Sequence, residues 1–395
     1  MNEGLISFLS QFDGHKAFVK MISDFAGTDA TSTISFFIYL AACLAVVGVM
    51  ATIGGLGTYA ERKISADLQA RQGPNRVGPF GLLQMLADGV KMILKEDIIP
   101  SAADKPMFIM APMLCIVGVF GSLAVVPFSS GFILSDLNVG VFYLLGISSL
   151  VGVGIFIGGY SSNSKWSMLG GMRGASQIIS YEIPVTLSII AIVVLSGGMS
   201  FGTLIGGQGG FPHEWYILHN PFTFIAFFVY FIGALAETNR APFDLPEAES
   251  ELVSGYHTEY TGMRFAFFAL AEYIEVFVVC GVAAALFFGG WKVPFDLGTG
   301  EAFSALPPII AKNIGQILQL GSFFTKTLLL YYVVIWIRWT LPRLRVDQLM
   351  TLCWKYLTPI ALFNLIMIAV WAYAFDGKSM FELFTAMGSG STGGH

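Results

Sequence analysis

The sequence predicts an all-α polytopic membrane protein with about eight transmembrane helices and one amphipathic helix at the membrane interface. The mean hydropathy is +0.71, only 12% of the residues are charged, and the chain contains 35 Phe and 45 Gly. A soluble domain of this size has no core large enough to bury so much apolar surface, whereas a bundle of helices can expose it to lipid.

Eight apolar segments each approach the roughly 20 residues that a helix needs to cross a bilayer. They lie at about 34–60, 107–128, 138–160, 174–198, 221–241, 265–289, 320–341 and 350–374. We therefore expect a membrane domain at 34–375, an N-terminal extracytoplasmic extension at 1–33 and a flexible tail at 376–395. The extension lacks a basic start followed by a short apolar core, so the first span is expected to act as the insertion signal.

The placement of basic residues predicts the orientation. If the N-terminus is outside, 15 of the 21 Lys and Arg residues fall on the cytoplasmic side, 5 fall outside and 1 lies within a span. This bias is the one that the positive-inside rule describes. The cytoplasmic connections are then 61–106, 161–173, 237–264 and 338–349, and both termini are extracytoplasmic.

The first cytoplasmic connection contains the amphipathic helix. After the turn signal at Gly78-Pro79, apolar and polar residues separate onto two faces of a helix. The apolar face holds Leu83, Leu86, Val90 and Leu94, and the polar face holds Gln84, Asp88, Lys91 and Lys95. The segment is too short and too charged to span, so we expect it to lie in the plane of the interface rather than to be an ordinary surface helix.

Span 4 carries a carboxylate and a proline in its apolar part. Glu182 lies about nine residues into the span, or roughly 13 Å at 1.5 Å per residue. Pro184 has no N–H for the carbonyl of Ser180, so it can open a kink towards a hydrated gap between helices. A proton-exchanging role is the interpretation we favour for Glu182 over that of a buried structural acid.

Residues 236–277 concentrate acidic side chains between two spans. Eight of the 26 carboxylates lie here, and Arg240 and Arg264 are the only Lys or Arg residues among them. The acids are Glu237, Asp244, Glu247, Glu249, Glu251, Glu259, Glu272 and Glu275. Interleaved prolines, glycines and aromatic residues indicate a shaped loop rather than a solvated acidic run. Charge at a membrane interface is costly unless it pairs, faces water or titrates, which favours a function.

Glu272 and Glu275 lie three residues apart on one face of span 6, so each should change the proton affinity of the other. For this pair a proton role and a structural role remain equally open. The four cysteines lie inside predicted spans without C-x-x-C spacing, and the five histidines are scattered. Neither a disulfide framework nor a metal site is expected.

Four long segments closely resemble, in order and spacing, those of one family, the quinone-chamber membrane subunit of respiratory complex I. They are ERKISADLQARQGPNRVGPFGLLQMLADGVKMILKE, RGASQIISYEIP, AETNRAPFDLPEAESELVSGYHTEY and WIRWTLPRLRVDQLMTLCWK. The family comprises the H subunit of the bacterial NADH:quinone oxidoreductase and its mitochondrial counterpart, NADH dehydrogenase subunit 1. The likeness covers about residues 34–373 and implies eight spans, some of them arranged like half of an antiporter.

The resemblance implies site residues of two kinds. Those implied to line or support a quinone tunnel are Glu61, Arg62, Gln69, Arg71, Arg338, Arg343 and Arg345. Those implied to couple quinone reduction to proton movement are Glu182, Glu237, Arg240, Asp244, Glu247, Glu249, Glu251, Glu259 and Glu272. No such role is implied for Glu275 or Lys326.

The resemblance also implies the setting of the chain. The chain itself would bind no flavin, nucleotide or iron–sulfur cluster, and quinone would be its substrate. FMN and iron–sulfur clusters would lie on soluble partner subunits, and antiporter-like subunits and lipid would surround it in the bacterial inner membrane, with no nucleic acid. The alternatives are a secondary ion or proton transporter, a structural membrane anchor, and the equivalent subunit of a ferredoxin- or hydrogenase-linked complex. The choice between ubiquinone and menaquinone stays open.

Overall fold

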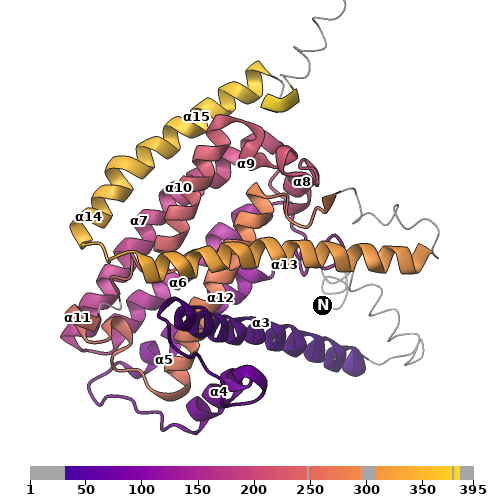
Figure 1. Ribbon diagram of the computed structural model, residues 1–395. Coiled ribbons are helices and arrows are strands. Elements are labelled where there is room, and N and C mark those ends of the chain that lie inside the picture. Colours follow the sequence, from indigo (N-terminus) through magenta and orange to yellow (C-terminus); the bar gives the residue numbers. More distant parts are fainter. Residues whose placement is uncertain (1–31, 247–248, 295–307, 376–377, 383–395) are drawn as a thin grey trace, which may run out of the picture.

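The computed structural model describes residues 32–246, 249–294, 308–375 and 378–382, so the predicted N-terminal extension and tail lie largely outside the described residues. The described part is helical, with one isolated bridge between Ser129 and Phe132 and no strand (Figure 1). The longer helices are α3 (Ser32–Leu68), α4 (Gln84–Leu94), α5 (Lys105–Leu123), α6 (Gly140–Ser161), α7 (Lys165–Ser196), α10 (Pro221–Glu237), α12 (Gly262–Phe287), α13 (Pro308–Thr340) and α15 (Thr358–Ala374). Shorter ones are η1 (Pro79–Gly81), α8 (Phe201–Gly206), η2 (Pro212–Glu214), α9 (Tyr216–His219), α11 (Glu249–Leu252), η3 (Gly255–His257), α14 (Val346–Thr351) and the π-helical turn η6 (Leu352–Leu357).

Helices lie over all eight predicted spans. Within the described residues, six are long and apolar enough to cross a membrane: α5, α6, α7, α12, residues 313–340 of α13, and the continuous helix 346–374 that joins α14, η6 and α15. The apolar helix α10 has 17 residues and is shorter, and α3 covers the first predicted span. The predicted all-α polytopic membrane fold is therefore confirmed. In lipid, a helix is favoured because it pairs its backbone polar groups internally.

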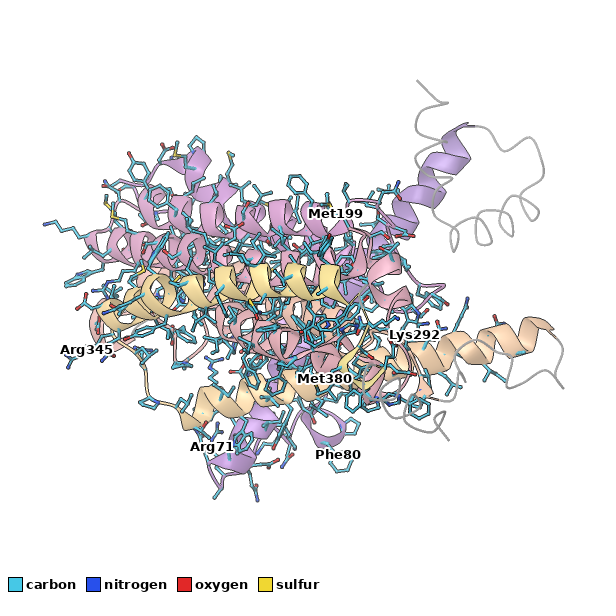
Figure 2. All side chains as sticks on the ribbon, turned by 90° about the horizontal axis from the view of Figure 1, so that it is seen from above. Arg71, Phe80, Met199, Lys292, Arg345 and Met380 are labelled. Atoms are coloured by element: carbon cyan, nitrogen blue, oxygen red, sulfur yellow. The ribbon has the colours of Figure 1, made fainter. Side chains whose placement is uncertain are left out.

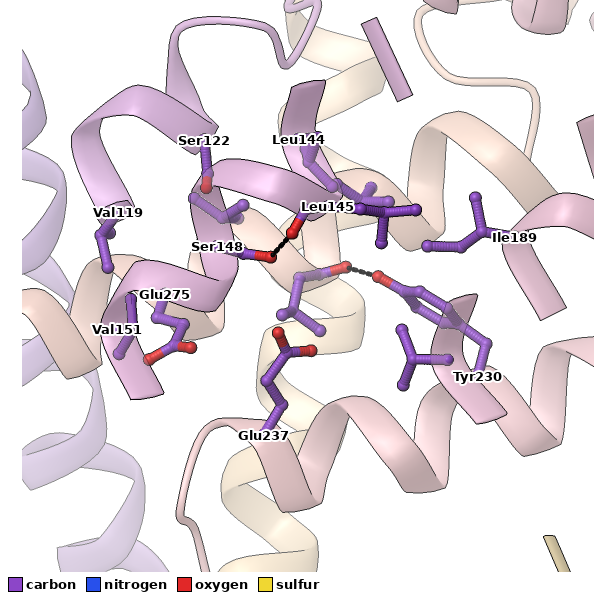
Figure 3. A pocket seen from close by; sticks show the side chains of 14 residues that line it. Val119, Ser122, Leu144, Leu145, Ser148, Val151, Ile189, Tyr230, Glu237 and Glu275 are labelled. Carbon is purple, nitrogen blue, oxygen red and sulfur yellow. Dashed lines mark hydrogen bonds between the residues drawn. The ribbon is translucent and has the colours of Figure 1, made fainter. Parts of the chain in front are cut away.

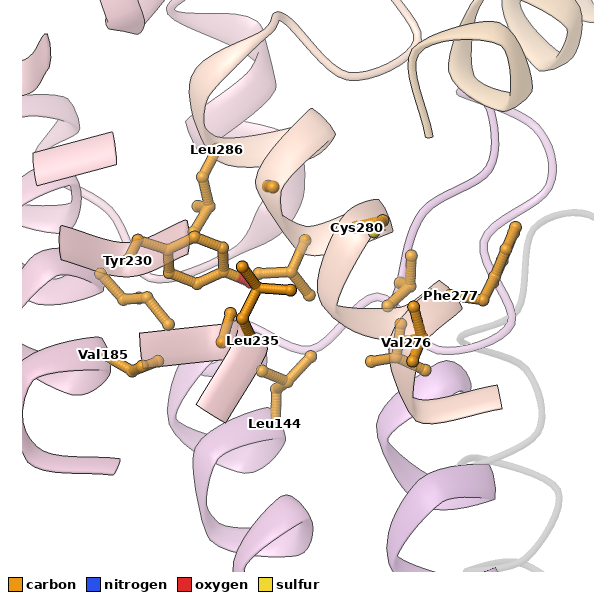
Figure 4. Packing of buried hydrophobic residues seen from close by; sticks show 14 of the residues in the cluster. Leu144, Val185, Tyr230, Leu235, Val276, Phe277, Cys280 and Leu286 are labelled. Atoms are coloured by element: carbon orange, nitrogen blue, oxygen red, sulfur yellow. The ribbon is translucent and has the colours of Figure 1, made fainter. Parts of the chain in front are cut away.

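The helix α12 lies at the centre of the bundle. It packs against α3, α5, α10 and α13, and residues 280–287 are all buried. Figure 4 shows how its side chains Val276, Phe277 and Leu286 meet the buried cluster of neighbouring helices. A helix that is apolar on all sides is the kind that becomes fully enclosed, and this enclosure brings the acids on α12 into the interior.

Glycines allow α6 and α7 to approach closely. A Cβ at Gly159 would lie 2.6 Å from the carbonyl oxygen of Ser167 and 2.8 Å from the Cα of Gly171. A Cβ at Gly171 would lie 3.0 Å from the Cα of Gly159. Contacts between small residues are a common way to pack helices in lipid, where no hydrophobic force acts between them. This close packing fixes α7, which carries Glu182.

The bundle has two ends, which we name after the residues Arg345 and Lys292 that mark them in Figure 2. The Arg345 end includes the loop between α10 and α12 and the loop 341–345. These loops are joined by a backbone hydrogen bond from Leu344 N to Pro242 O of 3.0 Å. The Lys292 end includes α8, α9 and the C-terminus of α12. The predicted orientation places these two ends on opposite sides of the membrane.

The helix α4 turns its apolar residues outward, since Leu86, Val90 and Leu94 are all exposed. On its other side, Asp88 accepts hydrogen bonds from Gln84 and from Arg62 of α3. Partial burial by itself raises the pKa of Asp88. The hydrogen bond and the charge of Arg62 nevertheless hold this pKa below its ordinary value. An exposed apolar stripe next to a paired polar face supports the expectation that α4 lies against lipid.

Candidate functional site

A buried carboxylate at the Arg345 end is held by two arginines. Glu61 of α3 is 8% exposed, and its Oε2 accepts a hydrogen bond of 2.5 Å from Nη1 of Arg240. Its Oε1 accepts a hydrogen bond from Nη1 of Arg338 on α13. The Arg240 guanidinium also lies 4.4 Å from the ring centre of Tyr273 on α12. We call Glu61, Arg240 and Arg338 the Glu61 cluster; with both arginines charged and Glu61 ionised, it has one excess positive charge.

Arg240 has capacity for a further partner. It is buried, and its Nε and Nη2 atoms meet no hydrogen-bond acceptor within the described residues. Burial by itself lowers the pKa of Arg240. The Glu61 carboxylate nevertheless raises this pKa above its ordinary value, so the guanidinium stays charged. A buried charged donor without an acceptor is costly unless water or a polar ligand satisfies it. The Glu61 cluster is therefore suited to attract a group that carries or develops negative charge.

The turn that carries Arg240 is fixed by side chains from elsewhere in the chain. Nε2 of Gln177 on α7 donates to the carbonyls of Ala236 and Phe243, each at 2.7 Å. Arg343 donates to Oδ2 of Asp244 at 2.9 Å. These contacts hold the loop from both sides, so the position of Arg240 does not depend on its own ion pairs alone.

Five residues that the resemblance assigns to the tunnel lie outside the Glu61 cluster: Arg62, Gln69, Arg71, Arg343 and Arg345. Arg343 pairs with Asp244, as described above. Arg62 pairs with Asp88 of α4. Nε of Arg71 donates to Oε1 of Gln69 at 2.6 Å, and both of these side chains are exposed. Arg345 is exposed at its end of the bundle (Figure 2). The structure thus brings together only part of this set.

A small cavity lies deeper in the bundle, and two carboxylates face it from different helices (Figure 3). Glu237 ends α10 and is 8% exposed, and Glu275 of α12 is 6% exposed. Ser122, Ser148 and Tyr230 add hydroxyl groups to an otherwise apolar wall. The cavity has a volume of about 30 Å³, which is enough for about one or two waters. Within the described residues, neither carboxylate forms an ion pair.

Four carboxylates form a chain of neighbours through the bundle. Glu182 is close enough to Glu237 to repel it when both are ionised, and Glu275 interacts in the same way with both Glu237 and Glu272. Glu272 accepts a hydrogen bond of 2.8 Å from the hydroxyl of Tyr256. Because neighbouring carboxylates titrate as a coupled set, a proton gained by one member changes the proton affinity of the next.

Arg240 links this chain to the Glu61 cluster, since it interacts electrostatically with Glu272 and Glu275 as well as with Glu61. A change of charge beside Arg240 is therefore felt by the carboxylates that face the cavity.

The rest of the acidic loop is partly tied to basic side chains. Glu251 accepts from Arg173 of α7 at 2.7 Å, and Glu259 is half-buried. Glu249 begins α11 but its side chain lies outside the described residues, as does all of Glu247.

The sequence left the role of Glu275 open and the resemblance implied none, whereas the structure places Glu275 at the cavity together with Glu237. Its three-residue spacing from Glu272 was the available signal, but spacing alone gave no reason to prefer one acid over the other. Within the described residues, no group of three or more His, Cys, Asp or Glu could hold a metal ion.

Comparison with known proteins identifies the family of the chain. Residues 40–369 match the family model described as NADH dehydrogenase. The chain is 46% identical to the H subunit of NADH-quinone oxidoreductase from Anaeromyxobacter dehalogenans over 88% of this chain and 86% of the relative. It is 47% identical to the same protein of Chlorobaculum tepidum over 80% and 87%, and 46% identical to that of Bacillus cytotoxicus over 85% and 94%. The chain therefore belongs to the NADH dehydrogenase family of membrane proteins, whose relatives are named as the H subunit of NADH-quinone oxidoreductase.

Proposed function

We propose that this chain forms the membrane part of a quinone tunnel in NADH-quinone oxidoreductase and couples quinone reduction to proton translocation. The observation that carries the proposal is the continuity between the Glu61 cluster and the carboxylates around the cavity. Arg240 belongs to the cluster and also interacts with Glu272 and Glu275. The same side chain is thus positioned to sense a ligand on one side and proton-carrying groups on the other.

The proposed mechanism is electrostatic. Reduction of a quinone adds two electrons and then two protons, so negative charge develops on its head group. If that charge forms near the Glu61 cluster, it draws on the unused donors of Arg240 and weakens the field that Arg240 exerts on Glu275. The proton affinity of Glu275 then rises, and the coupled carboxylates Glu237 and Glu182 respond in turn. A change of 1.36 kcal/mol in such an interaction alters a proton affinity about tenfold.

The remaining parts of the enzyme would lie on partner subunits. Soluble subunits with FMN and iron–sulfur clusters would dock at the Arg345 end, where Arg71 and Arg345 are exposed, and would complete the tunnel. Antiporter-like membrane subunits would receive the signal from the carboxylates. The Arg345 end would face the cytoplasm of a bacterial cell, with this chain in the inner membrane and both termini outside.

The test uses the complete enzyme in its membrane with either Glu237→Gln or Glu275→Gln. Each change keeps the shape of the side chain but removes its proton exchange, so we expect proton pumping coupled to quinone reduction to fall at least about tenfold. Glu214→Gln at the Lys292 end is the matched control and should leave pumping unchanged, because Glu214 lies on the surface away from the cavity.

Normal assembly with full quinone reduction and full pumping in both variants would refute the proposal. Ion transport by the purified chain alone, reconstituted in vesicles, would instead favour the secondary transporter.

A further inference from the structure

The proline break in α7 is closed by a cysteine from another helix. Pro184 has no N–H, so the carbonyl of Ser180 lacks its normal helical donor. The Sγ of Cys353 lies 3.0 Å from this carbonyl oxygen and donates to it, and the cysteine is fully buried. Because a buried carbonyl without a donor is costly, this thiol stabilises the kinked form of α7.

A π-helical turn presents the thiol. Residues 352–357 form the turn η6, which interrupts the continuous helix 346–374. The carbonyl of Cys353 accepts from both the backbone N–H and the Oγ1 of Thr358, the latter at 2.9 Å. A single π-helical turn within an α-helix shifts the facing of its side chains and is frequent at functional sites. Here it directs Cys353 towards α7.

A second contact ties the same two helices together one turn away. The hydroxyl of Tyr181 donates to the carbonyl of Leu349 at 2.8 Å, and the Tyr181 side chain is fully buried. Its ring lies 5.7 Å from that of Phe243 in the acidic loop. Glu182 is the next residue along α7, so the residue before it is fixed to both the last helix and the loop.

We propose that Cys353 is a positioning residue for Glu182, with Tyr181 as its companion. Together they couple the Pro184 kink to α14 and to the loop 341–345, which is joined to the acidic loop through Arg343 and Asp244. Movement of these loops then changes the position of Glu182 relative to Glu237. This inference rests on the proposed function, because it assigns a task to Cys353 within the same carboxylate chain.

The test compares Cys353→Ala with Cys353→Ser in the assembled enzyme. The alanine removes the donor to Ser180, whereas the serine hydroxyl keeps one. We expect Cys353→Ala to lower coupled proton pumping by about two- to tenfold, the range that corresponds to one hydrogen bond, and to shift its pH profile. Cys353→Ser should restore both to near the wild-type values. Cys280→Ala removes another buried thiol, one that lies on α12, and should change neither.

A double variant separates positioning from general stability. Pro184→Ala returns a backbone N–H to the carbonyl of Ser180, so Cys353→Ala should have little further effect in that background. In the infrared spectrum of the wild-type enzyme, the S–H stretch of Cys353 should lie at the frequency of a hydrogen-bonded thiol and should shift when quinone is reduced. The band is assigned by its loss in Cys353→Ala. Because the shift is measured in the wild-type enzyme, it still tests the inference if the alanine variant assembles poorly.

An unchanged pH profile in Cys353→Ala, a failure of serine to restore it, or an S–H stretch insensitive to quinone would overturn the positioning role. If Glu182→Gln reduces pumping while Cys353→Ala does not, the proposed function stands without this device. If the glutamine variants of Glu182, Glu237 and Glu275 are all silent, the proposed function itself fails.

Discussion

The Arg345 end and the Lys292 end of the bundle both bury polar groups, but they satisfy them in different ways. At the Arg345 end, carboxylates form ion pairs with guanidinium groups, as in the Glu61 cluster. At the Lys292 end, buried side chains bond mainly to the backbone. An arrangement of coupled charges responds to a new charge or proton, whereas bonds to backbone groups do not.

Gln208 shows the second solution. Its Nε2 donates to the carbonyls of Ala285 and Leu286, at 3.0 and 3.2 Å, and its Oε1 accepts from the backbone N–H groups of Tyr216 and Gly289, at 3.2 and 2.8 Å. One neutral amide thus joins the loop after α8 to the start of α9 and to the C-terminus of α12. All of its partners lie on the main chain, so their geometry is fixed by the helices.

Lys326 follows the same pattern although it is charged. Its Nζ donates to the carbonyls of Gly290 and Lys292, at 2.9 and 3.0 Å, and lies 4.9 Å from the ring centre of Trp215. A cation placed just beyond the C-terminus of α12 is also favoured by the helix dipole. Under the proposed function, the Lys292 end stays closed, while the charges of the Arg345 end respond to a new charge or proton.

The largest effect should follow from Arg240→Met. It leaves the buried Glu61 with Arg338 as its single ion-pair partner, and breaking a buried ion pair costs about 3–5 kcal/mol. We expect a lower thermal midpoint of the detergent-solubilised enzyme and loss of quinone reduction. Arg343→Met is the control, because its pair with Asp244 is partly exposed and such pairs contribute about 0–1 kcal/mol. An equal fall of the thermal midpoint in the two variants would show that the buried ion pairs of the Glu61 cluster stabilise the protein no more than the partly exposed pair of Arg343.

A smaller effect on stability, and none on chemistry, is expected for Gln208→Met. The methionine fills similar space but leaves buried carbonyls and N–H groups unpaired, which costs about 1–3 kcal/mol. The thermal midpoint should fall while quinone reduction per assembled enzyme stays unchanged. The exposed Gln72→Met serves as the control. Reduced quinone turnover in assembled Gln208→Met would contradict the proposal that the two ends differ in function.

The sequence predicted the helices well because membrane spans depend on local hydropathy and length, and Glu182 stood out for the same local reason. The sequence could not predict the ion pairs of the Glu61 cluster, because Arg240 and Arg338 lie 179 and 277 residues from Glu61 along the chain. Nor could spacing show that Glu275, one turn after Glu272, faces the cavity, because this depends on the helices around α12. Gln208 gave no signal at all, since an isolated Gln near a span is ordinary until its partners are known.

The smallest expected effect concerns acid stability at the Arg345 end. His257 lies between the rings of Tyr256 and Phe265, at 4.8 and 5.3 Å. Burial lowers the pKa of His257 below its ordinary value of 6.5, against the opposing charges of Glu272 and Asp244. The folded protein therefore binds fewer protons than the unfolded chain below about pH 6.5, and stability is lost as the pH falls from there towards the folded pKa.

One such histidine changes the free energy of unfolding by at most about 1.4 kcal/mol per pH unit. We expect His257→Gln to flatten the decline of the thermal midpoint as the pH falls below about 6.5, because the glutamine has no proton to gain. His213→Gln is the matched control, since this histidine lies at the Lys292 end with 55% of its side chain exposed, and its removal should leave the slope as it is. If instead His213→Gln flattens the decline and His257→Gln does not, the acid sensitivity belongs to the Lys292 end. For histidine titration, the Lys292 end would then be the responsive one and the Arg345 end the closed one.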